Sequence, residues 1–143
     1  MAKRKKRLPE LPKYPPQYVI DRAVAELGIE DVVVSVSGGQ DSVVTLDLCK
    51  KHFRNVYAFF MYFVRGLSFQ EQYLTYLEKR YQIEILRLTH WGLTHMFRDC
   101  VFRHGTKQSK RIKLTSIRDI ESFAKKKLGA QWVRHSRSAP TSS

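Results

Sequence analysis

The chain is poor in acidic residues. Its 143 residues contain 13 Asp and Glu against 26 Lys and Arg, so the net charge is +13 with neutral histidines. Such an excess favours polyanionic partners, namely nucleotides, nucleic acid or acidic membrane surfaces. A solvated basic surface without any partner gives the same composition, so charge alone does not choose between these alternatives.

Cysteine is scarcer still, and only Cys49 and Cys100 occur. They form neither a CxxC pair nor a Cys/His zinc spacing, so neither a zinc site nor an iron–sulfur cluster is expected. Two lone cysteines fit a reducing cytoplasm, which is the expected location. Cys100 lies in the apolar context FRDCVF and is interpreted as a packing residue.

Long apolar runs are also absent. No run approaches the ~20 residues that span a bilayer, so no membrane partner is expected. Residues 1–14 form a basic, proline-broken arm that lacks the apolar core of a signal peptide. The arm either contacts nucleic acid or serves as a flexible, solubilising tail.

Residues 15–134 suffice for one domain with a core. Residues 135–143 show no periodicity and are expected to be disordered.

Strand-like and helix-like stretches alternate along residues 15–134. The strand-like stretches are apolar and lie at 31–36, 56–64, 83–88 and 130–133. The helix-like stretches show helical spacing of apolar residues or cap signals and lie at 15–28, 42–52, 68–81, 93–102 and 116–129. The alternation predicts an α/β fold, a single doubly wound, mainly parallel sheet of about four to five strands with helices on both faces.

Three local signals refine the helices. Ser68 with Glu71, and Ser116 with Asp119, match the pattern of reciprocal helix caps. Gly28 and Gly129 are suited to end the first and last helices. In the helix after Ser68, large residues recur every fourth position, which favours core packing over a cofactor site: Phe69, Tyr73, Leu77 and Tyr81.

The hexapeptide SGGQDS interrupts the apolar pattern directly after the strand 31–36. Its two glycines can adopt positive φ and expose successive N–H groups to an anion. The next helix directs its positive end at the same point, and two serine hydroxyls add donors. Asp41 either caps the helix or holds Mg²⁺ through water. The predicted phosphate site therefore comprises Ser37, Gly38, Gly39, Gln40, Asp41 and Ser42.

Other phosphate loops are excluded, because neither G-x-x-x-x-G-K-[ST] nor G-x-G-x-x-G is present. SGGQDS instead resembles the PP-loop, S-G-G-x-D-S, of the adenine nucleotide α-hydrolase-like superfamily, the alternative being a Gly-Gly turn with an ordinary helix cap. The strand–helix spacing and the closing helix SIRDIESFAKKKLGAQWV are most similar to the phosphoadenosine phosphosulfate reductase-like branch. That branch includes sulfonucleotide reductases and many phage-encoded proteins, and the resemblance covers roughly residues 17–133.

The resemblance implies an adenine nucleotide, either ATP or a sulfated adenosine nucleotide, bound with Mg²⁺. It places the phosphates on the hexapeptide and the adenine near the ends of the first two strands. In this sequence the adenine position corresponds to the backbone around Met61, Tyr62 and Phe63.

The sequence departs from that branch near its C-terminus. The nucleophilic cysteine of sulfonucleotide reductases, in an E-C-G-[IL]-H context, is absent, and so are the paired cysteines of tRNA thiolation enzymes. Family members also continue past the fourth strand with a Gly-x-Arg-x-x-Asp-Ser-like segment, where this chain has RHSRSAPTSS. The expectation is a shortened or diverged C-terminal end.

Several polar residues follow the predicted strands and are candidates for anion contacts. Arg65 follows the second strand, His90 ends the third, and Arg134 and His135 follow the fourth. Each either binds phosphate or sulfate and stabilises charge in the transition state, or is an ordinary loop residue. Together with Asp41, His90 and Arg65 are the catalytic candidates. A metal pair of His90 with His95 is not expected, because a spacing of five does not place them on one helix face.

Three functions follow from these features. The first is a PP-loop enzyme that acts at the α-phosphate of ATP or on a sulfated adenosine nucleotide, without the reductase cysteine. The second is a non-catalytic nucleotide-binding module that acts with a larger protein partner or as a homo-oligomer covering a bare sheet edge. The third is a basic nucleic-acid-binding accessory protein, based on residues 1–14 and the segment HGTKQSKRIK.

Overall fold

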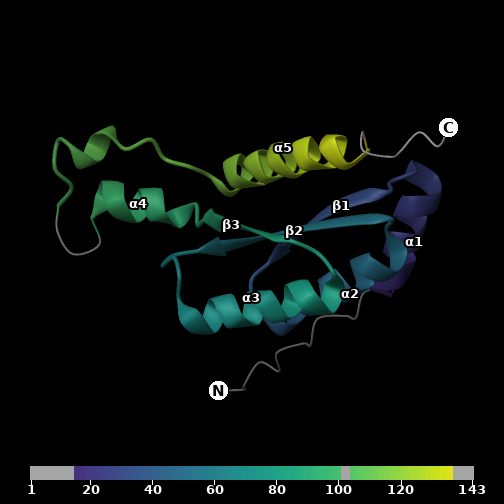
Figure 1. The fold of residues 1–143 in the computed structure, drawn as a ribbon. Helices are drawn as coiled ribbons and strands as arrows, with labels where there is room; N and C mark the ends of the chain where they lie inside the picture. The colour runs from purple at the N-terminus through teal and green to yellow at the C-terminus, as the bar shows by residue number, and fades with distance from the viewer. Residues whose placement is uncertain (1–14, 101–103, 137–143) are drawn as a thin grey trace, which may run out of the picture.

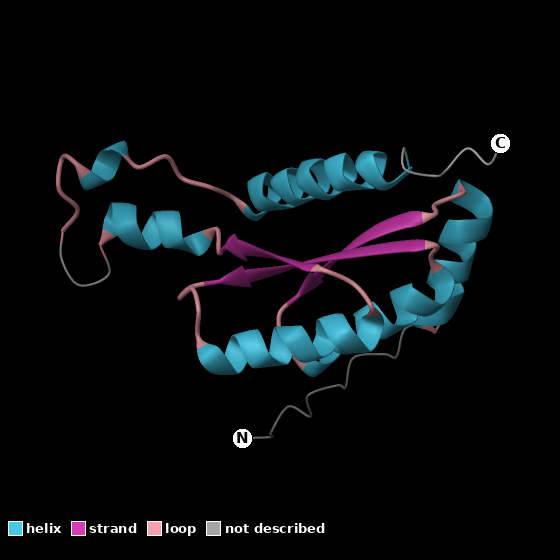
Figure 2. Cartoon of the chain, in the orientation of Figure 1, coloured by secondary structure: helices cyan, strands magenta, loops and turns pink. Residues whose placement is uncertain are grey.

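A computed structural model describes residues 15–100 and 104–136. A parallel sheet lies between helices on its two faces (Figures 1 and 2), which confirms the predicted α/β class. The elements are α1 (Pro16–Leu27), β1 (Asp31–Val36), α2 (Gln40–His52), β2 (Asn55–Tyr62), α3 (Ser68–Tyr81), β3 (Ile85–Thr89), α4 (Gly92–Asp99), the short 3₁₀ helix η1 (Ser109–Arg111) and α5 (Ile117–Ser136). Within these ranges, no helix has the length and apolarity needed to cross a membrane. Residues 1–14 and 137–143 lie outside the described part, and the domain limits stay a prediction.

The sheet has the strand order β1-β2-β3, and both neighbouring pairs are parallel. Val36 at the end of β1 is in register with Phe60, and Tyr62 at the end of β2 is in register with Thr89 at the end of β3. The carboxyl ends of the three strands therefore meet along one edge of the sheet, called the carboxyl edge below. The sheet of the described residues has three strands, fewer than the four to five expected.

The missing strand is residues 130–133, because α5 continues as one helix through Ser136. The stop predicted at Gly129 is therefore also wrong. A glycine inside a helix costs only about 1 kcal/mol relative to alanine, whereas each further helical residue adds a backbone hydrogen bond. A four-residue strand would instead have to pair with an edge strand of the sheet, and here the helix prevails.

Two cores flank the sheet. The larger one lies between the sheet and the α2–α3 layer and buries Val34, Val36, Leu46, Cys49, Val56, Ala58, Phe60, Leu74, Leu77, Tyr81 and Ile85. On the opposite face, toward α5, the buried residues are Phe59, Ala124 and Leu128. Side chains of a strand alternate between faces, so Ala58 and Phe60 enter one core while Phe59 enters the other.

Two of the predicted helix ends are confirmed, and the predicted cap of α3 is wrong. Gly28 ends α1 at a φ of 62°, with its N–H donating to the Val24 carbonyl, as expected. Ser116 and Asp119 also form their reciprocal cap, in which the Ser116 N–H donates to Asp119 Oδ2 at 2.7 Å. The capping box at Ser68 is wrong, because Ser68 is already helical and no side chain caps α3.

The stripe of large residues on α3 is only half buried. Leu77 and Tyr81 lie in the core, but Phe69 is 66% exposed and Tyr73 36% exposed. Because 3.6 residues make one turn, a four-residue step drifts about 40° around the helix, and three steps move the stripe by about a third of a turn. The N-terminal half of the stripe consequently points away from the sheet.

Candidate functional site

The loop after β1 has one residue whose conformation requires glycine. Gly38 has a φ of +86°, in the left-handed region, and a Cβ there would lie 3.9 Å from Cε1 of Tyr73 on α3. Gly39 has a φ of −82°, so the positive φ expected for both glycines occurs only at Gly38. The Gly39 carbonyl accepts hydrogen bonds from Ser42 Oγ at 2.8 Å and from the Val43 N–H at 3.4 Å.

The N-terminus of α2 is open. Gly39 is its N-cap residue, and the Gly39 N–H makes only a long hydrogen bond to Ser37 Oγ. No side chain in the described residues bonds to the N–H groups of Gln40, Asp41 or Ser42, so the capping bond considered for Asp41 is not formed. Gln40 and Asp41 are exposed, and Ser42 is half-buried. The first turn of a helix leaves backbone N–H groups without intrahelical partners and carries partial positive charge. This loop and helix end therefore offer a position for an anion.

The two serines of the loop have different roles. Ser37 Oγ accepts a long hydrogen bond, 3.4 Å, from the Gly39 N–H, which leaves its own hydroxyl hydrogen available. Ser42 instead uses its hydroxyl hydrogen on the Gly39 carbonyl and thereby closes the loop. Ser37 is thus the hydroxyl that is ready to donate to a ligand.

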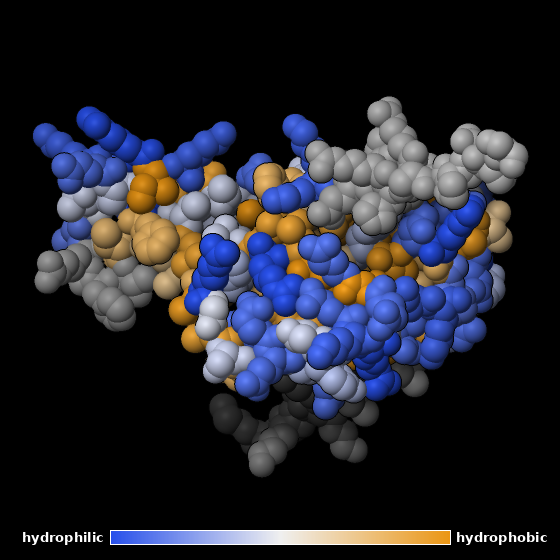
Figure 3. Space-filling view, viewed as in Figure 1, coloured by the Kyte–Doolittle hydropathy of each residue, from blue (hydrophilic) through white to orange (hydrophobic). Residues whose placement is uncertain are grey.

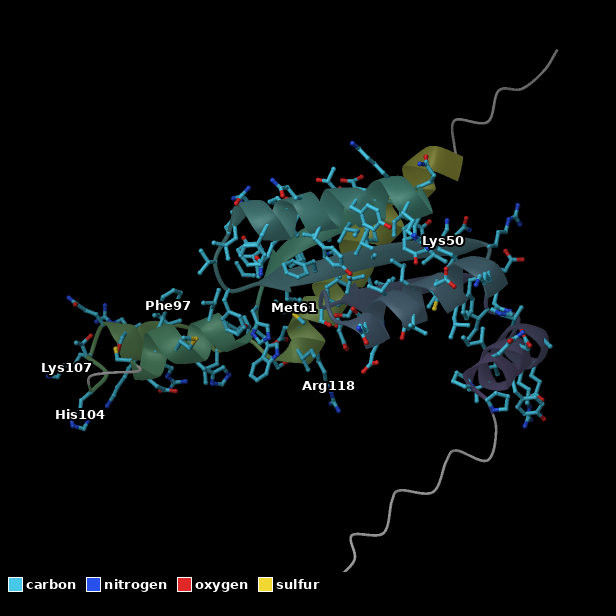
Figure 4. All side chains as sticks on the ribbon, turned by 90° about the horizontal axis from the view of Figure 1, so that it is seen from below. Lys50, Met61, Phe97, His104, Lys107 and Arg118 are labelled. Carbon is cyan, nitrogen blue, oxygen red and sulfur yellow. The ribbon has the colours of Figure 1, made fainter. Side chains whose placement is uncertain are left out.

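The end of β2 presents one side chain to each face and one to solvent. Tyr62 packs against the α2–α3 core, and Met61, labelled in Figure 4, is half-buried on the alternate side of the strand. Phe63 is 51% exposed directly beyond the strand. Its ring stacks on His90, with centroids 4.1 Å apart and planes inclined by 22°.

The end of β3 holds His90 in a defined orientation. Its backbone N–H donates to the Tyr62 carbonyl at 2.9 Å, and its Nδ1 accepts from the Gly92 N–H at 3.0 Å. Because Nδ1 is an acceptor, the neutral ring carries its hydrogen on Nε2. Trp91 lies beside it, with ring centroids 5.3 Å apart. Phe63, His90 and Trp91 are called the aromatic ledge below.

Arg65 lies in the turn after β2 and is exposed. Strands in a sheet are spaced by about 4.8 Å, so the residues after β1 and β3 start about 10 Å apart, with the residues after β2 between them. The structure thus brings Ser37, Arg65 and His90 to one edge. The remaining candidates, Arg134 and His135, lie instead within α5, and the fourth strand that would have placed them there does not exist.

Metal ligands are sparse in this region. Among the residues that the structure describes, no group of three or more His, Cys, Asp or Glu residues is positioned to hold a metal ion. Asp41 is the acidic residue in the first turn of α2. Mg²⁺ in nucleotide sites is commonly held by one or two carboxylates together with phosphate oxygens and water, and Asp41 fits that donor set.

Neither cysteine belongs to the carboxyl edge. Cys49 lies in the last turns of α2 and is buried, and burial raises the pKa of its thiol. Cys100 ends α4, whose eight residues span about 12 Å away from β3. It is half-buried, and its Sγ lies 3.7 Å from the Phe97 carbonyl oxygen.

Sequence reasoning missed Tyr73 and the aromatic ledge. The four-residue spacing predicts a core position for Tyr73, but the drift of that spacing along α3 carries Tyr73 toward the loop. The ledge depends on β2 and β3 ending in register, which places Phe63 beside His90 across the sheet. No local pattern in the sequence encodes that pairing.

The chain resembles a known protein family over most of its length. Residues 31–137 match the family described as phosphoadenosine phosphosulfate reductase domain. The fold is similar to the NH3-dependent NAD synthetase from Campylobacter jejuni subsp. jejuni NCTC 11168 in complex with the nitrate ion, at 19% sequence identity and a TM-score of 0.49. That similarity covers 85% of this chain and 48% of the synthetase chain, so the chain spans about half the length of that protein. No curated protein matches significantly. Since the family match covers most of the chain and includes β1 and its loop, the chain belongs to the phosphoadenosine phosphosulfate reductase domain family, a PP-loop family of adenine-nucleotide-binding proteins.

Proposed function

We propose that the chain binds an adenine nucleotide at the carboxyl edge and acts at the α-phosphate of ATP or on a sulfated adenosine nucleotide, without a catalytic cysteine. The observation that carries the proposal is the open N-terminus of α2 behind the left-handed Gly38. A parallel strand, a loop with exposed N–H groups and a helix N-terminus together favour phosphate.

The phosphates would lie on the loop from Ser37 to Ser42. Backbone N–H groups at the start of α2 and the hydroxyl of Ser37 donate to phosphate oxygens, while Ser42 holds the loop through the Gly39 carbonyl. Bound Mg²⁺, held partly by Asp41, would neutralise phosphate charge. Such fixed donors stabilise charge that develops in the transition state without reorganisation.

The aromatic ledge would receive the base. Phe63 offers an exposed ring face next to Met61 and Tyr62, which is where the adenine is expected. The Nε2–H of His90 and the guanidinium of Arg65 are donors for a phosphate or sulfate that extends across the edge. In an adenylation, an acceptor oxygen would bond to the α-phosphorus while the bond to the bridging oxygen breaks and pyrophosphate leaves.

Calorimetric titration with ATP, AMP and phosphoadenosine phosphosulfate tests the proposal, with Gly38→Ala against Gly28→Ala as a matched pair. Both glycines have positive φ, 86° and 62°, and neither Cβ meets an atom within 3.4 Å. Each substitution should cost about 1–2 kcal/mol of stability. Only Gly38→Ala should weaken binding, by about tenfold or more, because only Gly38 shapes the phosphate loop.

Two results would overturn the proposal. One is the absence of heat at millimolar concentration for all three nucleotides with the unmodified chain. The other is equal affinity of the two glycine variants. If the chain binds a nucleotide, release of pyrophosphate from ATP by the isolated chain identifies an enzyme, and binding without release identifies a non-catalytic nucleotide-binding module.

A further inference from the structure

The segment that follows β3 projects from the carboxyl edge, away from the α2–α3 layer (Figure 1). It consists of α4 (Gly92–Asp99) and residues 104–115, which include η1 (Ser109–Arg111), and is called the basic hairpin below. Within it, α4 contacts η1.

Hydrogen bonds fix the hairpin at both ends. Near the sheet, Thr94 Oγ1 lies 3.0 Å from Thr115 Oγ1 and accepts from the Thr115 N–H at 3.0 Å. At the outer end, Ser109 Oγ donates to the Arg98 carbonyl at 3.0 Å. A Cβ on Gly105 would lie only 2.8 Å from the same carbonyl oxygen, so the backbones approach closely there. These contacts hold α4 and residues 104–115 together.

The hairpin and the start of α5 concentrate positive charge. Residues 104–118 contain no Asp or Glu, and their five cations are all exposed: Lys107, Lys110, Arg111, Lys113 and Arg118. The ion pairs found in the described ranges involve α1, α2, the loops before β1 and β2, and the contact of β3 with α3. The three cations at η1, namely Lys107, Lys110 and Arg111, thus have no carboxylate partner there.

Exposed apolar side chains accompany these cations. Met96 is 44% exposed and Phe97 61% exposed on α4. Figure 3 shows hydrophilic residues at the outer end of the hairpin beside an apolar area, and Figure 4 places Phe97, His104 and Lys107 on this projecting part. Exposed cations and an exposed ring on the same projecting segment match the two needs of single-stranded nucleic acid, neutralisation of phosphates and stacking of bases.

A membrane surface fits the hairpin less well. Helices that lie on anionic membranes carry several Lys or Arg on their polar face. α4 has a single cation of that kind, Arg98, followed directly by Asp99. The positive charge lies instead on the turn around η1, where it can follow a phosphate backbone.

We propose that the basic hairpin binds single-stranded nucleic acid, with Lys107, Lys110 and Arg111 on the phosphates and Phe97 stacking on a base. The surface is distinct from the phosphate loop after β1 and does not depend on a nucleotide there. Because the hairpin leaves the same carboxyl edge, a strand bound along it would extend toward that loop.

Fluorescence anisotropy with a labelled 20-nucleotide oligo(dT) tests the proposal. The variant Lys107→Glu/Lys110→Glu/Arg111→Glu is compared with Lys125→Glu/Lys126→Glu/Lys127→Glu on the exposed side of α5, which changes the net charge equally. The hairpin variant should lose about tenfold or more in affinity, and the slope of log K against log salt should become shallower by about 2, because three phosphate contacts disappear. The α5 variant should stay within about threefold. Phe97→Ala should cost about fivefold or more.

Equal losses in the two triple variants would overturn the proposal, since net charge alone would then explain the binding. Binding to vesicles of anionic lipid without binding to the oligonucleotide would overturn it in favour of a membrane surface. Circular dichroism shows whether each variant is folded. Gly38→Ala should keep its oligonucleotide affinity, so a failure of the proposed nucleotide site leaves this test intact.

Discussion

Glu78 on α3 joins that helix to the edge strand β3, and its replacement by glutamine gives a sharp test of the packing. Glu78 Oε1 accepts from the Ile85 N–H at 2.9 Å and from Arg87 Nη1 at 2.5 Å, and Oε2 accepts from Arg87 Nη2 at 3.2 Å. The Glu78→Gln side chain keeps an oxygen for Ile85 but turns an NH₂ group toward the guanidinium.

The magnitude follows from the exposure of the pair. Hydrogen bonds to charged groups contribute about 1.5–3 kcal/mol when buried, and exposed ion pairs about 0.2–1 kcal/mol. The side chains of Glu78 and Arg87 are 22% and 27% exposed, so an intermediate value applies. Glu78→Gln should lower the free energy of unfolding by about 1–2 kcal/mol at pH 7, which corresponds to a Tm about 3–8 °C lower for a domain of this size.

The pH dependence has a definite sign. Burial acts to raise the pKa of Glu78, but the hydrogen bonds from Arg87 and Ile85 outweigh it, and the pKa lies below its ordinary value of 4.5. A depressed folded-state pKa gives stability that is present above the unfolded-state pKa and is lost as the pH falls through the folded-state pKa. The difference between the unmodified chain and Glu78→Gln should therefore be full at pH 7 and shrink below about pH 4.5.

Urea unfolding followed by circular dichroism at pH 7 and pH 3 measures this difference. Glu26→Gln is the matched control, because Glu26 accepts two hydrogen bonds from Arg22, at 2.7 and 2.9 Å, but both side chains are 55% exposed. The control should cost about 0.5 kcal/mol or less. A Glu78→Gln effect no larger than that of the control, or one that is unchanged at pH 3, would refute the reasoning.

Three further predictions concern single residues. Gly129→Ala should raise the free energy of unfolding by about 0.5–1 kcal/mol, because Gly129 is inside α5 and its Cβ would meet nothing within 4 Å; a loss of stability in thermal denaturation would contradict this. Gly105→Ala should cost about 1–3 kcal/mol, because its Cβ would lie 2.8 Å from the Arg98 carbonyl oxygen, and unchanged urea unfolding would show that the hairpin adapts. Iodoacetamide at pH 8 should modify Cys100 before Cys49, whose burial raises its pKa; mass spectrometry gives the order, and equal rates without urea would disprove it.

The features that were predictable from sequence are those in which neighbouring residues decide the structure. Gly28 ends α1 in the left-handed conformation, and Ser116 caps α5 with Asp119, because each involves residues only a few positions apart. The parallel sheet follows from the alternation of elements, and the loop at Gly38 follows from its position between a strand and a helix.

The predictions that failed, and the contacts that were missed, concern residues whose partners are distant in the sequence. The local pattern predicts that Glu71 caps Ser68, but its carboxylate accepts a hydrogen bond from Nε of Arg87 on β3 at 3.2 Å. Phe63 and His90 stack because two strands end in register. Residues 130–133 have the composition of a short strand, yet they extend α5.

The division of the sheet into two unequal cores has a consequence for synthesis on the ribosome. The α2–α3 side can form once β3 has emerged, because all of its buried residues precede β3 or lie at its start, at Ile85. The other face, with Phe59, is covered only when Ala124 and Leu128 of α5 arrive. At about 5–20 residues per second, the nascent chain carries an uncovered apolar sheet face for several seconds, the interval in which a chaperone for this protein would act.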